Sequence, residues 1–319
     1  MQDLVSIIIP LFNESENVDF LADELFKTFG TNQLFEVEFI LVDDGSVDNT
    51  FNKVLATDFH GLQVRAVKLS RNFGAHEAIR AGILKSNGNI VTFLPADLQD
   101  PPDVSIRLYE KFITGYDIVW GQRRTYQKKY SEKLFSEFYA YLMQRIVFAN
   151  FPEKGMDLAM FNEKVKEQLC LNAEANSSII LQIMGLGYKQ GFIEYDKVDR
   201  KRGTSKWTFA KKIKLVVDSF IAFSYFPIRL VSFVGVICFI FGIVWTIYIM
   251  SRKLMFNDVV QGWALLSSIL LFGFGITNIS LGIVAEYLWR TLDAARNRPV
   301  FIVDKIVDIN YDKSDGQGK

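Results

Sequence analysis

Short apolar runs alternate with amphipathic stretches through the first 120 residues of the chain. The runs stop at polar, proline or glycine residues, which is typical of buried parallel strands. Between them, apolar residues recur at helical spacing, for example from Val18 through Leu25 to Phe29. The pattern predicts strands at 5–10, 38–42, 64–69, 90–94 and 116–120, and helices at 15–29, at 75–85 and from Pro101 onward.

This alternation predicts an α/β fold in which a mostly parallel sheet carries helices on both faces. In such sheets, ligands bind outside the carboxyl ends of the strands. Asp43 and Asp44 follow the second predicted strand, and Asp97 and Gln99 follow the fourth. We therefore expect two acidic clusters, distant in sequence, at one edge of one sheet.

Two long apolar stretches without a charge lie in the C-terminal third. Residues 230–250 form a stretch of 21 residues, and residues 259–285 form a stretch of 27. Each exceeds the about 20 residues that a helix needs to cross a bilayer. Because the loop between them is short, we expect a two-helix transmembrane hairpin within 229–288, with helices at about 230–250 and 260–286.

Basic residues are frequent on both outer sides of this hairpin, whereas its loop holds only Arg252 and Lys253. The positive-inside rule then puts both ends of the hairpin, and both termini, in the cytoplasm. The aromatic-rich stretch 131–148 is either a core-facing helix or a helix at the membrane interface. The expected division is a cytoplasmic α/β domain at 1–205, a juxtamembrane amphipathic helix at 206–228, the hairpin at 229–288 and a cytoplasmic tail at 289–319.

Composition narrows the possible partners and metals. Lys plus Arg total 36, as do Asp plus Glu, so the formal net charge is zero and no basic field for nucleic acid is expected. The chain has two cysteines and two histidines, which excludes a zinc site rich in these residues. Any bound metal would therefore use oxygen ligands, which suits Mg²⁺ or Mn²⁺.

The segment PADLQDPPD, residues 95–103, places acids and an amide at the end of the fourth predicted strand. Asp97 and Gln99 lie two residues apart, so on an extended strand end they point the same way and can share one ion with a diphosphate. The alternative is structural: Asp97 or Asp100 caps the helix that begins at Pro101.

Ordered motifs continue along nearly the whole chain. They are SIIIPLFNESENV (6–18), LVDDGSVDNT (41–50), SRNFGAHEAIRAG (70–82), PADLQDPPD (95–103), GQR (121–123), GMDLAMF (155–161), RKRGTSKW (200–207) and EYLWRTLDAARNRPVFIV (286–303). With these motifs the sequence resembles family-2 glycosyltransferases of the GT-A fold, in the polyprenyl-phosphate branch. That branch includes dolichyl-phosphate mannosyltransferase and bacterial undecaprenyl-phosphate glucosyl- and aminoarabinosyltransferases.

The resemblance implies inverting transfer of one sugar from a UDP- or GDP-sugar to a polyprenyl phosphate at the inner membrane, for glycan or cell-envelope modification. It also implies a divalent cation, Mg²⁺ or Mn²⁺, on the donor diphosphate. Asp97, Asp157 and Arg123 would carry the catalysis, with Asp157 on the acceptor side of the sugar. The implied contacts are Pro10, Phe12, Glu14, Asp43, Asp44, Asn72 and Gly74 for the nucleotide, Asp97 and Gln99 for the metal, and Arg123, Arg200, Arg202 and Lys206 for the acceptor phosphate.

Two positions depart from this branch, and rival functions stay open. Pro95 stands where many relatives have an acid, and Arg202 stands where a small residue is common. The rivals are a processive polysaccharide synthase and a membrane scaffold with a degenerate nucleotide pocket. Asp157 also has a bland interpretation, as a hydrogen-bonded polar residue near a turn. Asn278 in the second apolar stretch favours self-association into a homo-oligomer.

Overall fold

The computed structural model describes residues 2–124, 137, 139–145, 147–148, 151–152, 156–172, 177–198, 226–256, 262–296 and 298–310. The chain divides into two compact units, of which the first is discontinuous in sequence. The first unit is Met1–Lys212 with Pro299–Lys319, and the second is Ile213–Arg298.

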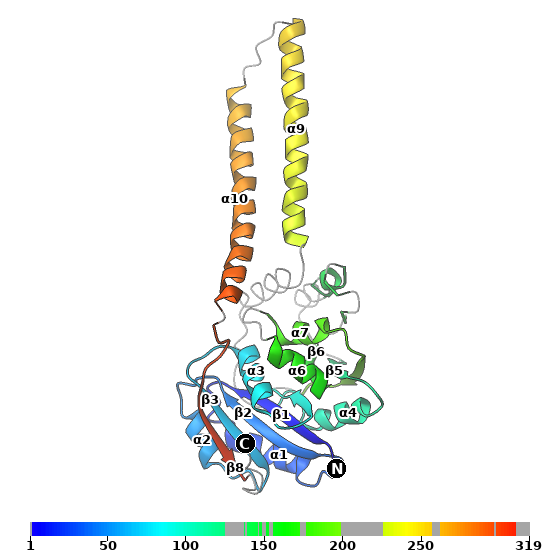
Figure 1. Cartoon of the computed structure of the whole chain (residues 1–319), viewed down its shortest axis with the longest axis vertical. Coiled ribbons are helices and arrows are strands. Elements are labelled where there is room, and N and C mark those ends of the chain that lie inside the picture. Colours follow the sequence, from blue (N-terminus) through cyan, green and yellow to red (C-terminus); the bar gives the residue numbers. More distant parts are fainter. Residues whose placement is uncertain are drawn as a thin grey trace. The chain divides into compact units, whose positions relative to one another are not determined.

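An eight-stranded sheet forms the centre of the first unit (Figure 1), in the order β7-β5-β6-β4-β1-β2-β3-β8. The pattern of alternating strands and helices therefore predicted the α/β class correctly. The sheet is mixed, however, because β6 runs antiparallel to β4 and β5, and β8 runs antiparallel to β3. The strands are β1 Leu4–Leu11, β2 Glu36–Asp43, β3 Gln63–Leu69, β4 Ile90–Phe93, β5 Ile118–Arg123, β6 Met156–Asn162, β7 Gln190–Tyr195 and β8 Val303–Ile309.

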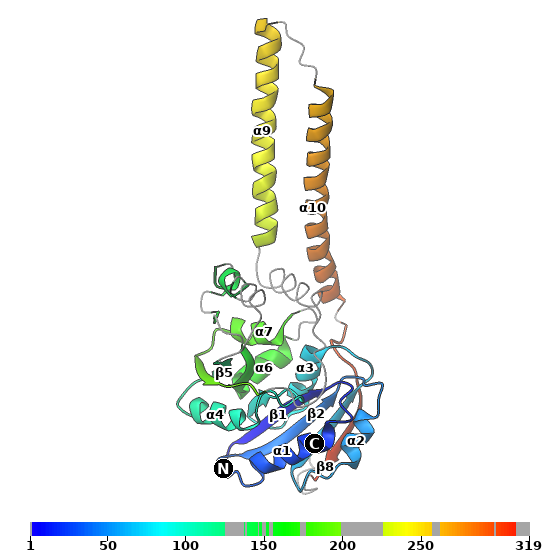
Figure 2. The same cartoon turned by 180° about the vertical axis from the view of Figure 1, so that it is seen from behind.

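Helices cover both faces of the sheet (Figure 2) because successive strand residues point to opposite sides. Ile7 and Ile9 of β1 pack in the hydrophobic cluster that contains α1, α2 and α4, whereas Ile8 packs in the cluster with α3, α6 and α7. The helices are α1 Val18–Phe29, α2 Thr50–Ala56, α3 Ala75–Lys85, α4 Asp103–Phe112, α6 Glu163–Leu171 and α7 Ile179–Gly185.

Strand β8 joins the sheet from the C-terminal end of the chain, which the hydrophobic pattern did not predict. It pairs with the edge strand β3, from Val64 opposite Ile309 to Leu69 opposite Val303. The Arg65 guanidinium donates two hydrogen bonds, of 2.6 and 3.2 Å, to the Asp308 carboxylate. The segment expected to be only a cytoplasmic tail therefore contributes a strand to the sheet.

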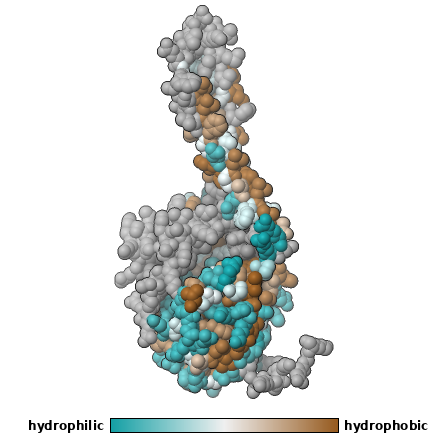
Figure 3. Space-filling model, turned by 90° about the vertical axis from the view of Figure 1, so that its left-hand side faces the viewer, coloured by the Kyte–Doolittle hydropathy of each residue, from teal (hydrophilic) through white to brown (hydrophobic). Residues whose placement is uncertain are grey.

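The second unit contains two long helices, α9 Phe226–Phe256 and α10 Trp263–Ala295. Among the described residues, Ile228–Trp245 of α9 is the one segment long and apolar enough to cross a membrane. The described helix surface in Figure 3 is largely hydrophobic. Phe233, Phe241 and Phe272 are 63%, 60% and 68% exposed. The second span at 260–286, and hence the hairpin, stays a prediction.

Two other sequence predictions fall mainly outside the described residues. Residues 199–225 are not described, and they include most of the juxtamembrane helix expected at 206–228. Of the aromatic-rich stretch 131–148, the described residues 137 and 139–145 are helical. Ala140 and Met143 in this part are buried, whereas Tyr141 is exposed.

Candidate active site at the carboxyl edge of the sheet

The carboxyl ends of the four central parallel strands meet at one edge of the sheet. Leu11 of β1 lies opposite Asp43 of β2, and Asp43 lies opposite Lys68 of β3. On the other side of β1, Phe93 of β4 lies opposite Ile8. The loops that follow these strands therefore gather at this edge, which is where open α/β sheets bind ligands.

Hydrogen bonds join the loop after β1 to the loop after β2. The Asn13 N–H donates to Ser46 Oγ at 2.9 Å, and the Val47 N–H donates to Asn13 Oδ1 at 3.0 Å. The Glu14 N–H donates to Thr50 Oγ1 at 2.9 Å. These bonds hold the predicted nucleotide residues Pro10, Phe12 and Glu14, all partly exposed, on one side of the site.

Gly45 allows the loops after β2 and β3 to touch. Its φ of +63° lies in the left-handed region, which favours glycine. A Cβ atom at this position would lie 2.5 Å from Arg71 Cα and 2.6 Å from the Asn72 backbone nitrogen. A larger residue at 45 would thus force apart the two loops that carry Asp44 and Asn72.

Asp43 and Asp44 are neighbours in sequence but differ in what their carboxylates bind. Asp44 is buried, and it accepts the Phe73 N–H at 2.7 Å and the Gly74 N–H at 2.9 Å. Burial raises the pKa of Asp44, and these two backbone bonds oppose that shift. Asp44 therefore fixes the loop that contains Asn72 and Gly74.

Asp43 has an oxygen that is available to a ligand. The side chain is 1% exposed, and Oδ1 accepts the Ser46 N–H at 3.1 Å. Within the described part of the chain, Oδ2 is buried and has no hydrogen-bond partner. Because an unsatisfied buried acceptor is costly, this oxygen is suited to accept a hydrogen bond from a ligand hydroxyl or N–H.

The loop after β4 holds Asp97 and Gln99 partly exposed, in a tight turn. Asp97 Oδ1 accepts the Gln99 N–H at 3.2 Å, and Leu98 between them has a φ of +52°. Helix α4 begins after Pro102, which makes no side-chain cap, and the partners of Asp100 among the described residues lie outside this helix. Instead, Asp100 is fully buried and binds Tyr195 Oη at 2.6 Å and Lys197 Nζ at 3.2 Å.

The donor set at this loop fits a hard divalent ion only in part. Asp97 and Gln99 offer carboxylate and amide oxygens, which Mg²⁺ and Mn²⁺ prefer. Among the described residues there is no group of three or more His, Cys, Asp and Glu side chains that could enclose a metal. These residues therefore suit an ion that takes its remaining ligands from a diphosphate and water.

Arg123 and Asp157 form an ion pair at the ends of β5 and β6. Each side chain is 25% exposed, so the pair faces partly into solvent. A register shift after Gly121 places Leu158 opposite Gly121 and Met156 opposite Gln122, which leaves Asp157 in the bulge. The structure thus brings together two residues that the sequence predicted separately, while Arg200, Arg202 and Lys206 lie outside the described residues.

Tyr195 and Lys197 are residues near this site that the sequence analysis missed. Their partner Asp100 lies 95 and 97 positions earlier in the chain. Burial, followed by the charge of Asp100, raises the pKa of Tyr195, so the phenol stays protonated at neutral pH. No local sequence pattern predicts a pair so far apart in the chain. The one available signal was Asp100 itself, an acid beside Asp97 in a loop bounded by prolines.

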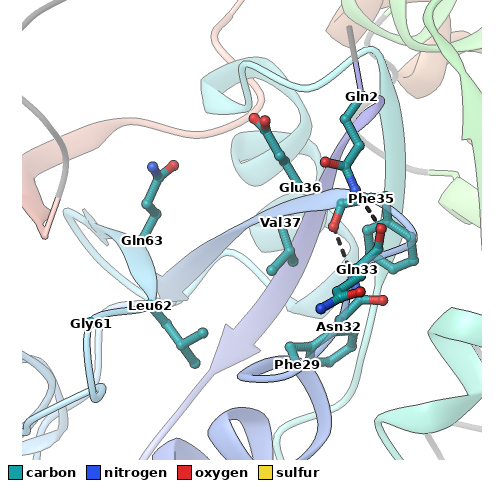
Figure 4. Close-up of a pocket in the computed structure, with 10 residues that line it drawn as sticks. All are labelled: Gln2, Phe29, Asn32, Gln33, Phe35, Glu36, Val37, Gly61, Leu62 and Gln63. Atoms are coloured by element: carbon teal, nitrogen blue, oxygen red, sulfur yellow. Dashed lines mark hydrogen bonds between the residues drawn. The ribbon is translucent and has the colours of Figure 1, made fainter.

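The opposite edge of the sheet has a hollow of about 380 Å³ (Figure 4). Side-chain amides dominate its polar lining, and Glu36 is its one acid. Gln2 Nε2 donates to the Gln33 carbonyl at 2.6 Å, and Asn32 Nδ2 donates to the Phe35 carbonyl at 2.9 Å. This hollow offers no set of groups for acid–base or metal chemistry.

The chain belongs to glycosyl transferase family 2, whose family model matches residues 6–170. It is 30% identical to an uncharacterized glycosyltransferase of Synechocystis sp., over 96% of each chain. It is 29% identical to the undecaprenyl-phosphate 4-deoxy-4-formamido-L-arabinose transferase of Proteus mirabilis, over 96% of this chain and 94% of that one. It is 28% identical to the prophage bactoprenol glucosyl transferase homolog of Escherichia coli K12, over 95% and 99%.

Solved structures are more distant. The mannosyltransferase PcManGT of Pyrobaculum calidifontis, in complex with GDP-Man and Mn²⁺, is 15% identical with a TM-score of 0.46. The match covers 91% of this chain and 88% of that one.

Proposed function

We propose that this glycosyltransferase moves a single sugar from a nucleotide sugar to a polyprenyl phosphate such as undecaprenyl phosphate, with inversion at the anomeric carbon. The observation that carries the proposal is the similarity to the undecaprenyl-phosphate arabinose transferase, which extends over 96% of the chain and thus through both helices of the second unit. The arrangement at the carboxyl edge of the sheet supports it with groups for a donor and for an acceptor phosphate.

The nucleotide binds among the loops after β1, β2 and β3. The buried Asp43 Oδ2, which lacks a partner among the described residues, accepts a hydrogen bond from the base or the ribose. Pro10, Phe12 and Glu14 line one side of the nucleotide. Asn72 and Gly74 line another side, on the loop that Asp44 holds through its two backbone bonds.

Asp97 and Gln99 hold Mg²⁺ or Mn²⁺ together with the donor diphosphate. A divalent cation there supplies positive charge to the departing nucleoside diphosphate. The Asp97 carboxylate is held at the turn by the backbone N–H of Gln99. Pro95 stands two residues before Asp97, so no further acid is available there to bind the ion. The donor diphosphate therefore supplies more of the ligands than the protein does.

The acceptor phosphate needs little help from a general base. A phosphate monoester has a second pKa of about 6, so at pH 7 it is mostly a dianion and already nucleophilic. Its approach to an anionic donor is the harder step, and Arg123 offsets this repulsion with a bidentate contact. We expect Arg200, Arg202 and Lys206, outside the described residues, to add positive charge.

Asp157 orients Arg123 before the acceptor arrives. Their ion pair fixes the guanidinium at the end of β5, and its partial exposure leaves room for a phosphate to share that guanidinium. The carboxylate then lies beside the reacting sugar, where it stabilises positive charge that develops at the anomeric carbon.

The second unit anchors the enzyme at the inner membrane. In this proposal α9 and α10 both cross the bilayer, with the sheet domain and both termini in the cytoplasm. The apolar segment Ile228–Trp245, in which Arg229 is the one charged residue, supports the first crossing. The homo-oligomer expected from Asn278 belongs to the same proposal.

A product assay with the full-length chain in membranes tests the proposal. Radiolabelled UDP- and GDP-sugars are offered with undecaprenyl phosphate, with Mn²⁺, Mg²⁺ or a chelator. We expect one metal-dependent product that carries a single sugar on the lipid phosphate. A polymer would instead identify a processive synthase, and the absence of transfer from every donor would favour the degenerate scaffold.

A further inference from the structure

The buried carboxylate of Asp100 directly follows the two expected metal ligands but faces away from solvent. It is 0% exposed, and each of its oxygens has a partner at or just after the end of β7. Oδ1 accepts from Tyr195 Oη at 2.6 Å, and Oδ2 accepts from Lys197 Nζ at 3.2 Å. Tyr195 is 1% exposed and the Lys197 side chain 10%, so the whole cluster is shielded from water. Charge-assisted bonds in such surroundings are strong.

The same cluster tethers the backbone of the loop. The Val198 N–H donates to the Gln99 carbonyl at 2.9 Å, one residue beyond Lys197. Leu98, between the expected ligands, has a positive φ, which is uncommon for a residue other than glycine. Such a conformation persists only where the surroundings hold it in place. The contacts from β7 supply that restraint.

Tyr195 is also locked to the strand that carries Arg123. The two residues lie opposite each other in the parallel pairing of β5 and β7, and the Arg124 N–H donates to the Tyr195 carbonyl at 2.8 Å. Gly121 makes room for the ring, because a Cβ there would lie 3.1 Å from Tyr195 Cε1. Tyr195 therefore connects the loop of Asp97, through its hydroxyl, to the strand end of Arg123, through its backbone.

We propose that Asp100, Tyr195 and Lys197 form a positioning unit that fixes the Asp97–Gln99 loop against β5 and β7. The unit sets the spacing between the metal ligands and Arg123 without touching the substrate. This inference rests on the proposed function, because it assigns the unit its effect on a metal and diphosphate bound at Asp97.

Tyr195→Phe in the full-length detergent-solubilised protein tests the unit, with Mn²⁺ in the presence of UDP, and separately GDP, as the probe. The signal of free Mn²⁺ in electron paramagnetic resonance gives the dissociation constant without turnover. We expect the constant to rise about tenfold, the size expected for one hydrogen bond to a charged group. Lys197→Gln, which also breaks a bond to Asp100, should raise it in the same direction.

Tyr109→Phe is the matched control. Tyr109 Oη donates to Asp3 Oδ2 at 2.8 Å, so the variant also removes a tyrosine–carboxylate bond, but before the start of β1 at the opposite edge. We expect this variant to bind Mn²⁺ with an unchanged constant, even where its melting temperature falls as far as that of Tyr195→Phe.

The outcomes separate the inference from the function on which it rests. Unchanged Mn²⁺ binding in both Tyr195→Phe and Lys197→Gln overturns the positioning unit, while metal-dependent transfer by the unaltered protein leaves the proposed function intact. Failure of the unaltered protein to bind Mn²⁺ with either nucleotide overturns the metal assignment itself. A tenfold rise confined to Tyr195→Phe and Lys197→Gln supports the unit.

Discussion

The two ends of strand β2 carry buried carboxylates in opposite circumstances. At the amino end, Glu38 Oε1 accepts from Ser6 Oγ at 2.5 Å, from the Asn87 N–H at 2.5 Å and from the Gly88 N–H at 3.0 Å. Its Oε2 accepts from Asn87 Nδ2 at 3.3 Å. At the carboxyl end, Asp43 is equally buried, but its Oδ2 has no partner within the described chain.

This difference separates a structural acid from an acid that is suited to bind a ligand. Glu38 closes the turn before β4, and Lys166 Nζ joins the same turn by donating to the Ser86 and Gly88 carbonyls at 2.8 and 3.0 Å. Its bonding is complete without a ligand. The carboxyl edge instead holds an acceptor with spare capacity beside a partly exposed Asp97. The two carboxylates are equally buried, and the ends of the strand differ in whether every carboxylate oxygen has a hydrogen-bond partner.

The largest effect is expected from Asp97→Asn at the carboxyl edge. The amide keeps the shape but loses the charge that binds the cation, so kcat/KM should fall at least about 100-fold, as for loss of one strong transition-state contact. Transfer to undecaprenyl phosphate measures it, with thermal unfolding as the control for folding. Full activity in this variant would remove the metal assignment.

Glu38→Ala at the amino edge should lower stability and leave donor binding unchanged. It leaves the Ser6 hydroxyl and the Asn87 N–H without their acceptor, while the Gly88 N–H keeps its bond to Ser6 Oγ, so we expect a loss of roughly 3 kcal/mol in the free energy of unfolding. Urea titration of the purified protein measures this loss. The KM for the donor should stay unchanged in the folded fraction; a large rise in KM would contradict the division between the two edges.

Gly45→Ala should affect both stability and donor binding, because the loops after β2 and β3 meet at this residue. Strain at a positive φ and the clash with Arg71 together should cost about 2 kcal/mol of stability. The donor KM should also rise, since the loop with Asn72 must move. Gly61→Ala is the control, as Gly61 has a φ of +84° with open space around it. A rise in donor KM in both variants would indicate a general effect of strain.

Asp43→Asn should weaken donor binding by about tenfold while stability changes little, because one hydrogen bond to a charged acceptor is lost. Asp44→Asn is the informative partner variant. Its amide cannot accept from both the Phe73 and Gly74 N–H groups as the carboxylate does, so the melting temperature should fall. Nucleotide titration and thermal unfolding of the two variants distinguish the roles. Equal effects of both variants on donor binding would contradict this assignment.

Substitution of His76 should change stability least at neutral pH. His76 lies in the first turn of α3, directly after the loop that Asp44 holds. Burial, followed by the charge of Arg80, lowers the pKa of His76 to about 4, and its Nδ1 has no partner among the described residues. As the pH falls from 6.5 toward 4, the unfolded chain binds a proton that the folded chain rejects, so stability falls. His76→Gln should reduce that loss, which melting temperatures between pH 7 and 4 would measure. An unchanged pH dependence would contradict the lowered pKa.

Local pattern predicted the elements that build the carboxyl edge but not the contacts that give each residue its role. The strand at 5–10 and the helix at 75–85 are found almost as expected, at Leu4–Leu11 and Ala75–Lys85, because burial on both faces leaves apolar runs in the sequence. Asp43 and Asp44, in contrast, look alike in a sequence. Only the fold shows that the second one holds a loop 29 residues away.

Long-range pairing also explains the two main omissions. Strand β8 can be identified only from its pairing with β3. Val303–Ile309 has exposed polar positions, which are typical of an edge strand, and its sequence shows no strong alternation of apolar and polar residues. The Arg123–Asp157 pair depends on a bulge, and a bulge arises from how two strands align rather than from either strand alone.

The return of β8 has a practical consequence for anyone who seeks a soluble enzyme. The polypeptide leaves the sheet after β7, passes through α9 and α10, and then supplies the sheet with its last strand. A fragment that stops before α9 would uncover the backbone groups of β3 and leave Arg65 without Asp308. Bridging Lys212 to Pro299 with a flexible linker would keep that strand together with Arg200, Arg202 and Lys206. The comparison of the two fragments would show how much the sheet depends on its C-terminal edge.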